Sequence, residues 1–421
     1  MTLTPTWETT SPGHVDDRAV EPRDLAWSTI PIFDEPVVYL GEAAETPFGP
    51  WREDLARHLE RWGPRPMAHG RAGLALIDRL EAANLTGRGG AHVPSHLKWR
   101  AARADAPGGI VVVNGAEGEP ASGKDAALLQ LRPHLVLDGA ALAAEAIDAR
   151  EVVVWLHASA HQTRSSVEIA IGERSRIGGE IPMRIELAPD AYVSGESSSV
   201  IRALQGGLPL PQFSRDRARP WGDGPAILVH NTETHARVAQ LARGAEYPTT
   251  SLLTITEASA PLKVSRRIVV EVDADAELAE VLATLRLPAP QAILLGGYSG
   301  TWLARADASG LVMSPQALAA RSLSLGAGVV YLLPPDRDGA REAAAILGYL
   351  ASQSAGQCGP CIFGLPELAQ SMSDWARSRR RRKRAERHLD SLEELIPGRG
   401  ACRHPDGALR MAMSAREAFA R

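Results

Sequence analysis

Residues 110–120 read IVVVNGAEGEP, and this stretch decides the fold. Four consecutive apolar residues, Ile110 to Val113, end at Asn114-Gly115, which is typical of a strand buried on both faces. Further strands are expected at 152–156, 183–187 and 226–229, with helical patterns between them. Buried strands that alternate with helices predict an α/β unit, in which helices cover both faces of a mostly parallel sheet.

The periodicity of the sequence changes on either side of this unit. Residues 1 to about 48 show weak periodicity, and we expect an extension that is part disordered and part packed on the body. Near residue 246 shorter strands predict a small α+β unit, and from about residue 338 the pattern is helical. The expected parts are an N-terminal extension over 1–65, an α/β domain over 66–245, an α+β domain over 246–335 and a helical domain over 336–421.

Individual elements can be placed within these parts. The strands expected in the α+β unit are 251–256, 267–272 and 292–295, with a helix over 277–285. The helices expected earlier in the chain are 51–62, 74–85 and 124–146, the last of them broken at Pro133.

Composition excludes several classes of protein. The chain has 421 residues, 44% of them hydrophobic, and a net charge of −4, which argues against bulk binding to nucleic acid or to membrane surfaces. No apolar run approaches the ~18 residues of a membrane span, and the N-terminus does not resemble a secretory signal. Three cysteines are too few for a disulfide framework and suit a reducing compartment. We therefore expect a cytoplasmic protein without direct membrane insertion.

A glycine-rich segment, TGRGGAHVPSHLKW over 86–99, precedes the first strand. Glycines let a backbone turn sharply and approach a ligand closely, and such a loop at a helix N-terminus is typical of an anion site. Lys98 adds positive charge. The segment is not the usual dinucleotide fingerprint, because a helix rather than a strand precedes it. The alternative is a plain loop between helices.

Three further polar segments follow expected strands or helices: NGAEGEP over 114–120, YVSGESS over 192–198 and VHNTET over 229–234. Ligands of open α/β sheets bind beyond the carboxyl ends of the strands. Each segment alone could be an exposed polar turn. Together with the glycine loop, they predict one crevice that could hold a phosphate-bearing ring compound.

All three cysteines lie in the helical part. Cys358 and Cys361 form a CxxC pair, and Cys402 follows 41 residues after Cys361. Thiolates are soft ligands that suit an iron–sulfur cluster or zinc, for which His404 could be a fourth ligand. A redox-active disulfide lacks the expected thioredoxin-like context. Three unconnected buried cysteines are the remaining alternative.

Together these segments resemble the flavin-binding subunit of respiratory complex I, the 51 kDa or F subunit, and its relatives in NAD-reducing hydrogenases and NAD-linked formate dehydrogenases. The resemblance covers about residues 50–421. The family's GRGGAGFPTGLKW and NADEGEPGTFKD correspond here to GRGGAHVPSHLKW and NGAEGEPASGKD. Its YICGEETAL, VVNNVET and ESCGxCxPCR correspond to YVSGESSSV, LVHNTET and QSAGQCGPCI.

The resemblance implies a fold and a set of cofactors. The fold is a Rossmann-like FMN domain, a ubiquitin-like β-grasp domain of the soluble-ligand-binding (SLBB) type, and a helical bundle with an iron–sulfur cluster. It implies that Glu119 contacts NADH. The residues that it implies for FMN are Gly87, Arg88, Gly89, Gly90, Lys98, Asn114, Glu117, Tyr192, Gly195, Glu196 and Asn231. The implied partners are a thioredoxin-like [2Fe–2S] subunit or a ferredoxin, within a larger redox complex, and no nucleic acid.

This sequence departs from the family at the nucleotide. The phenylalanines that sandwich adenine in the family are Val93 and Ala101 here, and a third cannot be placed. Base–aromatic stacking is worth ~1–3 kcal/mol per base, so NADH binding could be much weaker. Ala116 and Ser197 replace two acidic residues of the family motifs. The new arginines could instead hold a phosphate of NADPH or another donor, or be solvated; they are Arg215, Arg217 and Arg219.

The cluster motif departs as well. The family's first cysteine is Ala355 here, while Cys358, Cys361 and Cys402 occupy the other three positions. Three thiolates could hold a [3Fe–4S] cluster, or a [4Fe–4S] cluster with a fourth ligand of another kind. Drift after loss of the cluster is the alternative. The candidates for the fourth ligand are Ser354, Gln357, His404 and water.

A basic run, Arg377 to Arg384, lies between the second and third cysteines. It could be a solvated helix face. Close to a cluster it could instead steer an acidic ferredoxin.

These observations leave three functional hypotheses. The first is a flavin- and iron–sulfur-dependent oxidoreductase that moves electrons between a hydride donor, NAD(P)H by analogy with the family, and a one-electron carrier such as ferredoxin. In the second, FMN stays but the pyridine nucleotide site is lost. The third is a redox-silent scaffold subunit with zinc or no metal at the cysteines.

Overall fold

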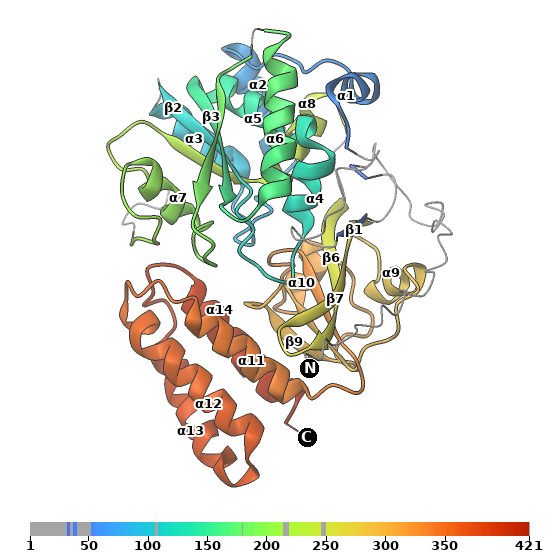
Figure 1. The fold of residues 1–421 in the computed structure, drawn as a ribbon, viewed down its shortest axis with the longest axis vertical. Helices are drawn as coiled ribbons and strands as arrows, with labels where there is room; N and C mark the ends of the chain where they lie inside the picture. The colour runs from blue at the N-terminus through green and yellow to red at the C-terminus, as the bar shows by residue number, and fades with distance from the viewer. Residues whose placement is uncertain are drawn as a thin grey trace, which may run out of the picture.

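The computed structural model describes residues 32–33, 37–39, 52–105, 108–178, 180–213, 219–245 and 250–420. Three units lie around a common centre. In Figure 1 a parallel sheet with its helices is at the top, a mixed sheet is at the lower right and a helical domain is at the lower left.

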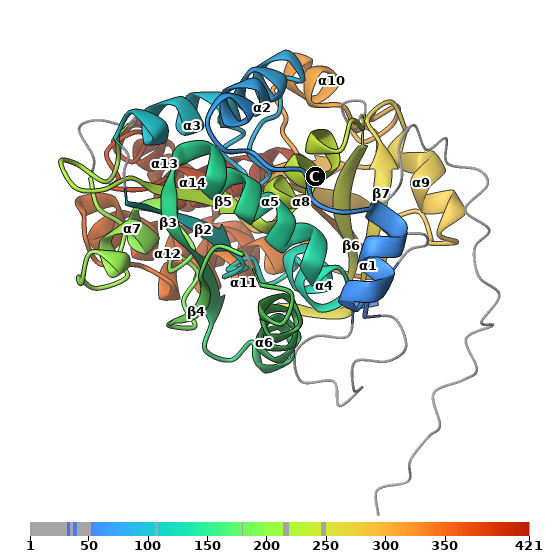
Figure 2. The same cartoon turned by 90° about the horizontal axis from the view of Figure 1, so that it is seen from above.

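The first unit contains a four-stranded sheet in the order β4-β3-β2-β5, and all of its pairs are parallel. Helices surround this sheet (Figure 2), and the apolar side chains of β2 are buried, as expected for a sheet covered on both faces. The elements of this unit are α1(Leu55–Trp62), α2(Arg71–Ala82), α3(Ser95–Ala104), β2(Gly109–Asn114), α4(Lys124–Leu131), α5(Pro133–Ile147), β3(Ala149–His157), α6(His161–Ser175), β4(Met183–Ala188), α7(Ser197–Leu204), β5(Ile227–Asn231) and α8(Thr232–Ala242).

The strand order contains a topological switch point. The chain runs from β2 outward to β3 and β4, and then returns to place β5 on the other side of β2. Asn114 and Asn231 are paired in the register at the carboxyl ends of β2 and β5. The connections that leave these two strands diverge, which opens the crevice where sheets of this kind bind ligands.

The second unit is a six-stranded mixed sheet in the order β1-β7-β6-β10-β8-β9. The β10–β6 pair is parallel and the other four pairs are antiparallel. Its elements are β1(Val37–Tyr39), β6(Thr250–Ala260), β7(Lys263–Asp273), α9(Leu278–Thr284), β8(Ala292–Leu295), β9(Thr301–Ala304), α10(Pro315–Ala320) and β10(Val329–Leu333).

Both faces of this mixed sheet are buried, against different neighbours. Along β10, Val330 and Leu332 pack with α9 and α10, whereas Tyr331 and Leu333 pack with the helical domain. Side chains alternate between the two faces of a strand, so the apolar side chains of β10 contribute to two separate hydrophobic cores. The mixed sheet therefore joins the helical domain firmly to the rest of the molecule.

The third unit is helical. Helices α11 and α14 pack together, and the α12–α13 hairpin lies outside them (Figure 1). Ring contacts join Phe419, just past α14, to Trp302 of β9. The elements are α11(Gly339–Ser352), the π-helical turn η2(Pro360–Gly364), α12(Leu365–Arg377), α13(Arg379–Leu395) and α14(His404–Ala418).

The mixed α/β class, the parallel sheet and the helical C-terminal part are confirmed. The expected strands form within four residues of their predicted ends, and the helix over 124–146 breaks at Pro133, which is the first residue of α5. The helix expected over 74–85 is displaced to 71–82, because Asn84 with φ 49° ends it early. Within the described part of the chain, no helix is long and apolar enough to cross a membrane.

The described part of the expected N-terminal extension packs on the body. Strand β1 pairs with β7, and the buried Ile32 donates its backbone N–H to Glu271 at 2.7 Å. The disorder expected for the remainder falls outside the described residues. The domain boundaries remain predictions, as does the β-grasp identity of the mixed sheet.

Candidate functional site

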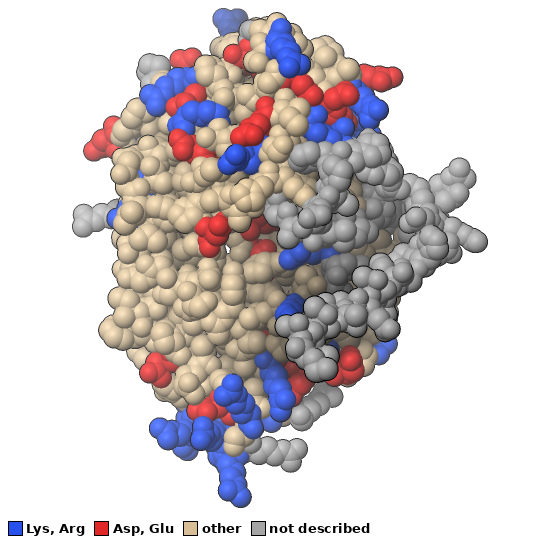
Figure 3. Space-filling model, viewed as in Figure 1, with Lys and Arg blue, Asp and Glu red and all other residues tan. Residues whose placement is uncertain are grey.

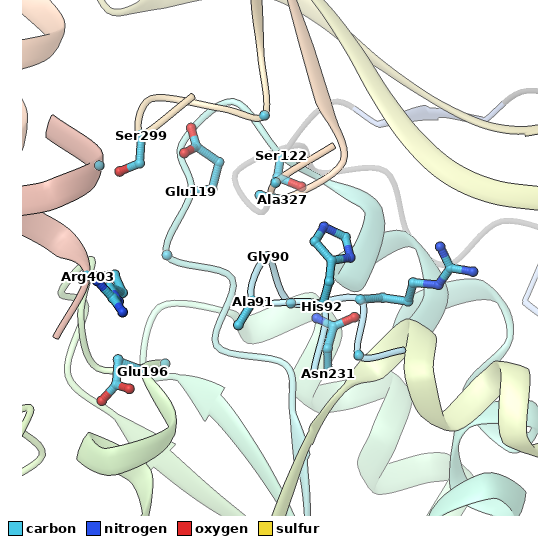
Figure 4. A pocket seen from close by; sticks show the side chains of 18 of the residues that line it. Gly90, Ala91, His92, Glu119, Ser122, Glu196, Asn231, Ser299, Ala327 and Arg403 are labelled. Atoms are coloured by element: carbon cyan, nitrogen blue, oxygen red, sulfur yellow. The ribbon is translucent and has the colours of Figure 1, made fainter. Parts of the chain in front are cut away.

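A cavity of about 790 Å³ lies where the three units meet. The glycine loop and the segments after β2 and β5 form one side, as Figure 4 shows from close by. Turns of the mixed sheet and the start of α14 form the other sides. The size is in the range of sites that bind small molecules and cofactors.

Each residue that the sequence predicted for FMN or NADH lines this one cavity, although the residues come from four separate segments. Their roles as ligand contacts remain predictions. These residues are Gly87, Arg88, Gly89, Gly90, Lys98, Asn114, Glu117, Glu119, Tyr192, Gly195, Glu196 and Asn231.

The glycine loop is held by its arginine. The backbone N–H of Arg88 donates to Thr234 Oγ1 at 2.9 Å, and its buried guanidinium reaches Ser251 Oγ at 3.0 Å. Gly90 has φ 95°, and a Cβ there would lie 3.6 Å from the backbone of Gly326. The loop is thereby fixed between the two sheets, with glycine at the position that needs left-handed backbone.

Polar side chains lie at the switch point, where β2 and β5 end. Asn114 donates from Nδ2 to the Gly195 carbonyl at 2.6 Å, while its Oδ1 is buried without a partner. Asn231 caps the N-terminus of α8, and its Oδ1 accepts from Lys124 Nζ at 3.1 Å. Lys98 is turned toward the Val229 carbonyl, 3.1 Å from its Nζ, and burial lowers its pKa.

Two carboxylates lie in the cavity wall, of which Glu119 is buried and Glu117 is half-buried. Burial raises the pKa of both Glu117 and Glu119 to about 7. Glu117 accepts from the backbone N–H groups of Asp125 and Ala126, each at 3.3 Å, in the first turn of α4. Glu119 reaches the mixed sheet and accepts from the Tyr298 backbone N–H at 2.8 Å.

Tyr192 links the three units. Its hydroxyl lies 2.9 Å from Ser299 Oγ and donates to Glu119 at 3.4 Å. Its backbone N–H donates to Gln353 Oε1 at 3.0 Å, just ahead of the cysteine segment. The tyrosine ring lies 5.1 Å from the ring of His404. The flavin motifs and the cysteine motif are therefore in direct contact.

The residues present fit FMN. The volume is sufficient, and two buried polar atoms in the wall have no partner in the protein, Asn114 Oδ1 and His92 Nε2. Leaving such atoms unpaired costs free energy, which a polar ligand would recover. The backbone N–H groups at the start of α8 and the glycine loop suit a phosphate.

The cysteines gather at one end of the helical domain. Cys361 is buried, and the Cys358 thiol is close enough to hydrogen bond with it and to raise its pKa beyond the effect of burial. Cys402 lines the cavity, and burial raises its pKa to about 12. These are free thiols, and they approach one another from two different segments.

The thiols are not arranged around a single metal ion. In the described part of the chain, no three His, Cys, Asp or Glu side chains are close enough to share one ion. An iron–sulfur cluster distributes its ligands over several iron atoms, so its thiolates need not converge on one point.

The candidate fourth ligands differ in their surroundings. The Ser354 hydroxyl donates to the Cys361 carbonyl at 3.0 Å, beside the thiol. Gln357 accepts from Arg202 at 3.2 Å and is exposed. His404 Nε2 donates to the Leu350 carbonyl at 2.8 Å, and its Nδ1 is buried without a partner.

The expectation that the basic run lies close to the cluster was wrong. Arg382 contacts the carbonyl of Phe419, which packs against Gly339 at the start of α11. The cysteines follow the other end of α11, a helix of 14 residues and therefore about 20 Å long. Figure 3 shows Lys and Arg gathered at the lower end of the molecule.

Arg219, one of the three arginines that could hold a phosphate, does not line the cavity. Arg219 is paired with Asp105, with Nε 2.7 Å from Oδ2. Arg215 and Arg217 lie outside the described residues.

The sequence did not predict three stretches of the cavity wall, which lie within 295–301, 322–327 and 403–410. Helix α14 and the residue before it contribute Arg403, Asp406, Gly407 and Arg410, which recur at the spacing of one helix face. That periodicity could have shown a common face, but nothing local indicates that the face meets a flavin cavity.

Two family models match the chain. One, described as the Nuo51 FMN-binding domain, matches residues 80–240, and the other, the NADH-ubiquinone oxidoreductase-F iron-sulfur binding region, matches residues 341–421. Together with the cavity, they define a protein of flavin and iron–sulfur electron transfer. FMN and an iron–sulfur cluster are its cofactors.

Curated proteins that are similar to this chain are subunits of hydrogenases and of NADH-ubiquinone oxidoreductases. The NADP-reducing hydrogenase subunit HndC of Solidesulfovibrio fructosivorans is 27% identical over 78% of this chain and 71% of its own length. The mitochondrial NADH-ubiquinone oxidoreductase 51 kDa subunit of Aspergillus niger is 25% identical over 76% of this chain and 69% of its own length. The chain belongs to the family of flavin-binding F subunits of complex I and NAD-reducing hydrogenases.

Some relatives are larger. The NAD-reducing hydrogenase HoxS subunit alpha of Cupriavidus necator is 27% identical over 71% of this chain, which spans about half (52%) of that protein. A crystal structure of an NAD+-reducing [NiFe]-hydrogenase in the H2-reduced state has the same fold, with a TM-score of 0.72 at 23% identity. The match covers 88% of this chain and 66% of the hydrogenase chain.

Proposed function

We propose that the chain is a subunit that moves electrons between a hydride donor and a one-electron carrier. NAD(P)H is the donor by analogy with the relatives, and the carrier is a ferredoxin or a thioredoxin-like [2Fe–2S] subunit within a larger redox complex. In this proposal residues 66–245 bind FMN, 246–335 form an SLBB-type β-grasp domain and 336–421 hold the cluster.

One observation carries the proposal: Cys402 lines the same cavity as the glycine loop. A flavin in this cavity would lie beside one of the cluster's thiolates. When bound, FMN takes a hydride as a pair of electrons and releases the electrons singly. A cavity shared by the two sites suits that exchange.

The protein's own residues would hold and shield the flavin. The glycine loop and the start of α8 would bind its phosphate, and Asn114 and Glu117 would bind its polar ring edge. With a pKa of about 7, Glu117 can donate or accept a proton at neutral pH. No protein acid or base is needed for the hydride step itself, so the remaining task is positioning.

A second candidate function is one in which FMN stays but the pyridine nucleotide site is lost. It is favoured by the small number of aromatic side chains among the described residues that line the cavity. Among the lining residues that the structure describes, Tyr192 is the one phenylalanine, tyrosine or tryptophan, and its hydroxyl is engaged by Ser299. Val93 is 38% exposed, and Ala101 packs against the apolar core. An adenine would find little to stack on. The flavin could then exchange electrons with proteins or with another hydride carrier.

An anaerobic titration of the FMN-reconstituted protein separates the two candidates. The oxidised flavin absorption is followed while NADH, and separately NADPH, is added. Bleaching at micromolar nucleotide supports the dehydrogenase function. No bleaching, with dithionite still reducing the flavin, supports the loss of the nucleotide site. The redox-silent scaffold is tested by anaerobic purification, since near-stoichiometric iron would contradict it.

A further inference from the structure

His92 lines the cavity but has no role in the family motif. The family's loop has glycine at this position, whereas this chain has histidine. The residue has φ 48°, a left-handed conformation that is uncommon for residues other than glycine. Such a conformation is strained and persists where the surroundings enforce it.

The His92 ring carries an unpaired buried atom. Its Nε2 is buried and has no hydrogen-bond partner in the protein. Burial, and next the nearby Arg88, lowers the pKa of His92, so the ring is neutral at pH 7. A buried imidazole nitrogen without a partner is unfavourable unless a ligand supplies one.

The surroundings of His92 suit an anion. Arg88 and Lys124 lie within electrostatic reach of the ring, with Glu233 partly opposing them. Figure 4 places His92 beside Gly90 and Asn231, on the side of the cavity away from Glu196 and Arg403. Asn231 caps α8, a helix of 11 residues, whose first N–H groups favour negative charge. These features place His92 at the end of the cavity that is formed by the glycine loop and the start of α8, where we propose that the phosphate binds.

We propose that His92 is an additional positioning residue for the flavin, whose Nε2–H donates a hydrogen bond to the phosphate of FMN. The proposal rests on the proposed flavin function. It assigns to this chain a side-chain contact in a loop where the family relies on glycine and backbone groups.

The proposal predicts selective loss of affinity for the phosphorylated flavin. In His92→Gly the imidazole is absent and the backbone strain is relieved. Hydrogen bonds to charged groups are strong enough that the Kd for FMN should rise roughly ten- to hundredfold. Riboflavin lacks the phosphate, so its Kd should not change. Both are measured by quenching of flavin fluorescence in the full-length protein.

Two further variants complete the test. His92→Asn keeps a side-chain donor and tolerates the left-handed backbone, so it should retain part of the FMN affinity. His69→Asn changes an exposed histidine away from the cavity and should leave both Kd values unchanged. If His92→Gly leaves the FMN Kd unchanged, or weakens riboflavin equally, the phosphate contact is wrong. Failure of the wild type to bind either flavin would instead contradict the proposed function.

Discussion

Glu119 is held by three hydrogen bonds and yet is costly to ionise. Burial raises its pKa to about 7, above the ordinary 4.5. Its contribution to stability is therefore full below pH 4.5 and is lost as the pH rises through about 7. Glu119→Gln cannot ionise. We expect the variant to gain up to about 3 kcal/mol of unfolding free energy over the wild type between roughly pH 5 and pH 8.

Urea unfolding of the flavin-free protein at the two pH values measures this difference. The comparison with the isosteric variant removes the contribution of groups common to both proteins, including Glu117. A difference that stays constant across the range would show that Glu119 is ionised in the folded protein.

At the rim of the cavity, Val93 is exposed in the position of a family phenylalanine. Val93→Phe should restore a surface on which a base can stack. Since one such contact is worth ~1–3 kcal/mol, we expect NADH to bind roughly five- to a hundredfold more tightly. Leu97→Phe is the matched control, because it is 53% exposed on the same segment but does not line the cavity. Equal effects of both variants would contradict a specific stacking site.

Helix α14 forms a wall of the cavity because one of its glycines allows close packing. A Cβ at Gly407 would lie 2.7 Å from Ser299 Cβ, whereas a Cβ at Gly348 of α11 would meet nothing within 4 Å. Gly348→Ala should therefore stabilise the protein by up to about 1 kcal/mol. Gly407→Ala should destabilise it by about 1–3 kcal/mol, through overpacking.

Thermal and urea unfolding measure this pair of variants. Both place the same methyl group inside a helix, so helix propensity cancels between them. If Gly407→Ala were as stable as Gly348→Ala, the contact between α14 and the mixed sheet would be looser than the structure shows.

The basic residues at the start of α13 destabilise this helix. Its first turn has no acidic residue, and Arg380 is exposed there beside other cations. Positive charge at a helix N-terminus is unfavourable by about 0.3–1 kcal/mol. Arg380→Glu should therefore raise the melting temperature at low salt, and the gain should shrink at high salt. Arg387→Glu, later on the same helix, should give a smaller gain; equal gains would contradict the dipole explanation.

The elements that could be predicted are those with a local cause. The strand at 110–113 is an uninterrupted apolar run, and Pro133 cannot continue the preceding helix. Strand β1 is three residues long and exists through its pairing with β7, which no local pattern shows. The basic run could also be identified from the sequence. Its distance from the cysteines could not be predicted, because that distance depends on how the α12–α13 hairpin packs against α11.

At the scale of the whole molecule, the cavity exists only because three units meet. The motifs for FMN could be read from the sequence, since they follow strand or helix ends whose meeting point the topology dictates. The contributions of Arg403 and Gly407 could not, because they depend on docking of α14 against the turn that holds Ser299. The same docking places Cys402 at the flavin cavity.

The most direct test of this account is an anaerobic EPR measurement of the FMN-loaded, iron-containing protein, in which the flavin is reduced stepwise and the cluster is observed. We predict that a reduced-cluster signal appears as the flavin accepts electrons in the wild type. In Cys402→Ser that signal should be lost or altered while the flavin is still reduced. A wild-type flavin that is fully reduced while the cluster stays oxidised, although dithionite reduces the cluster, would contradict electron transfer between the two sites.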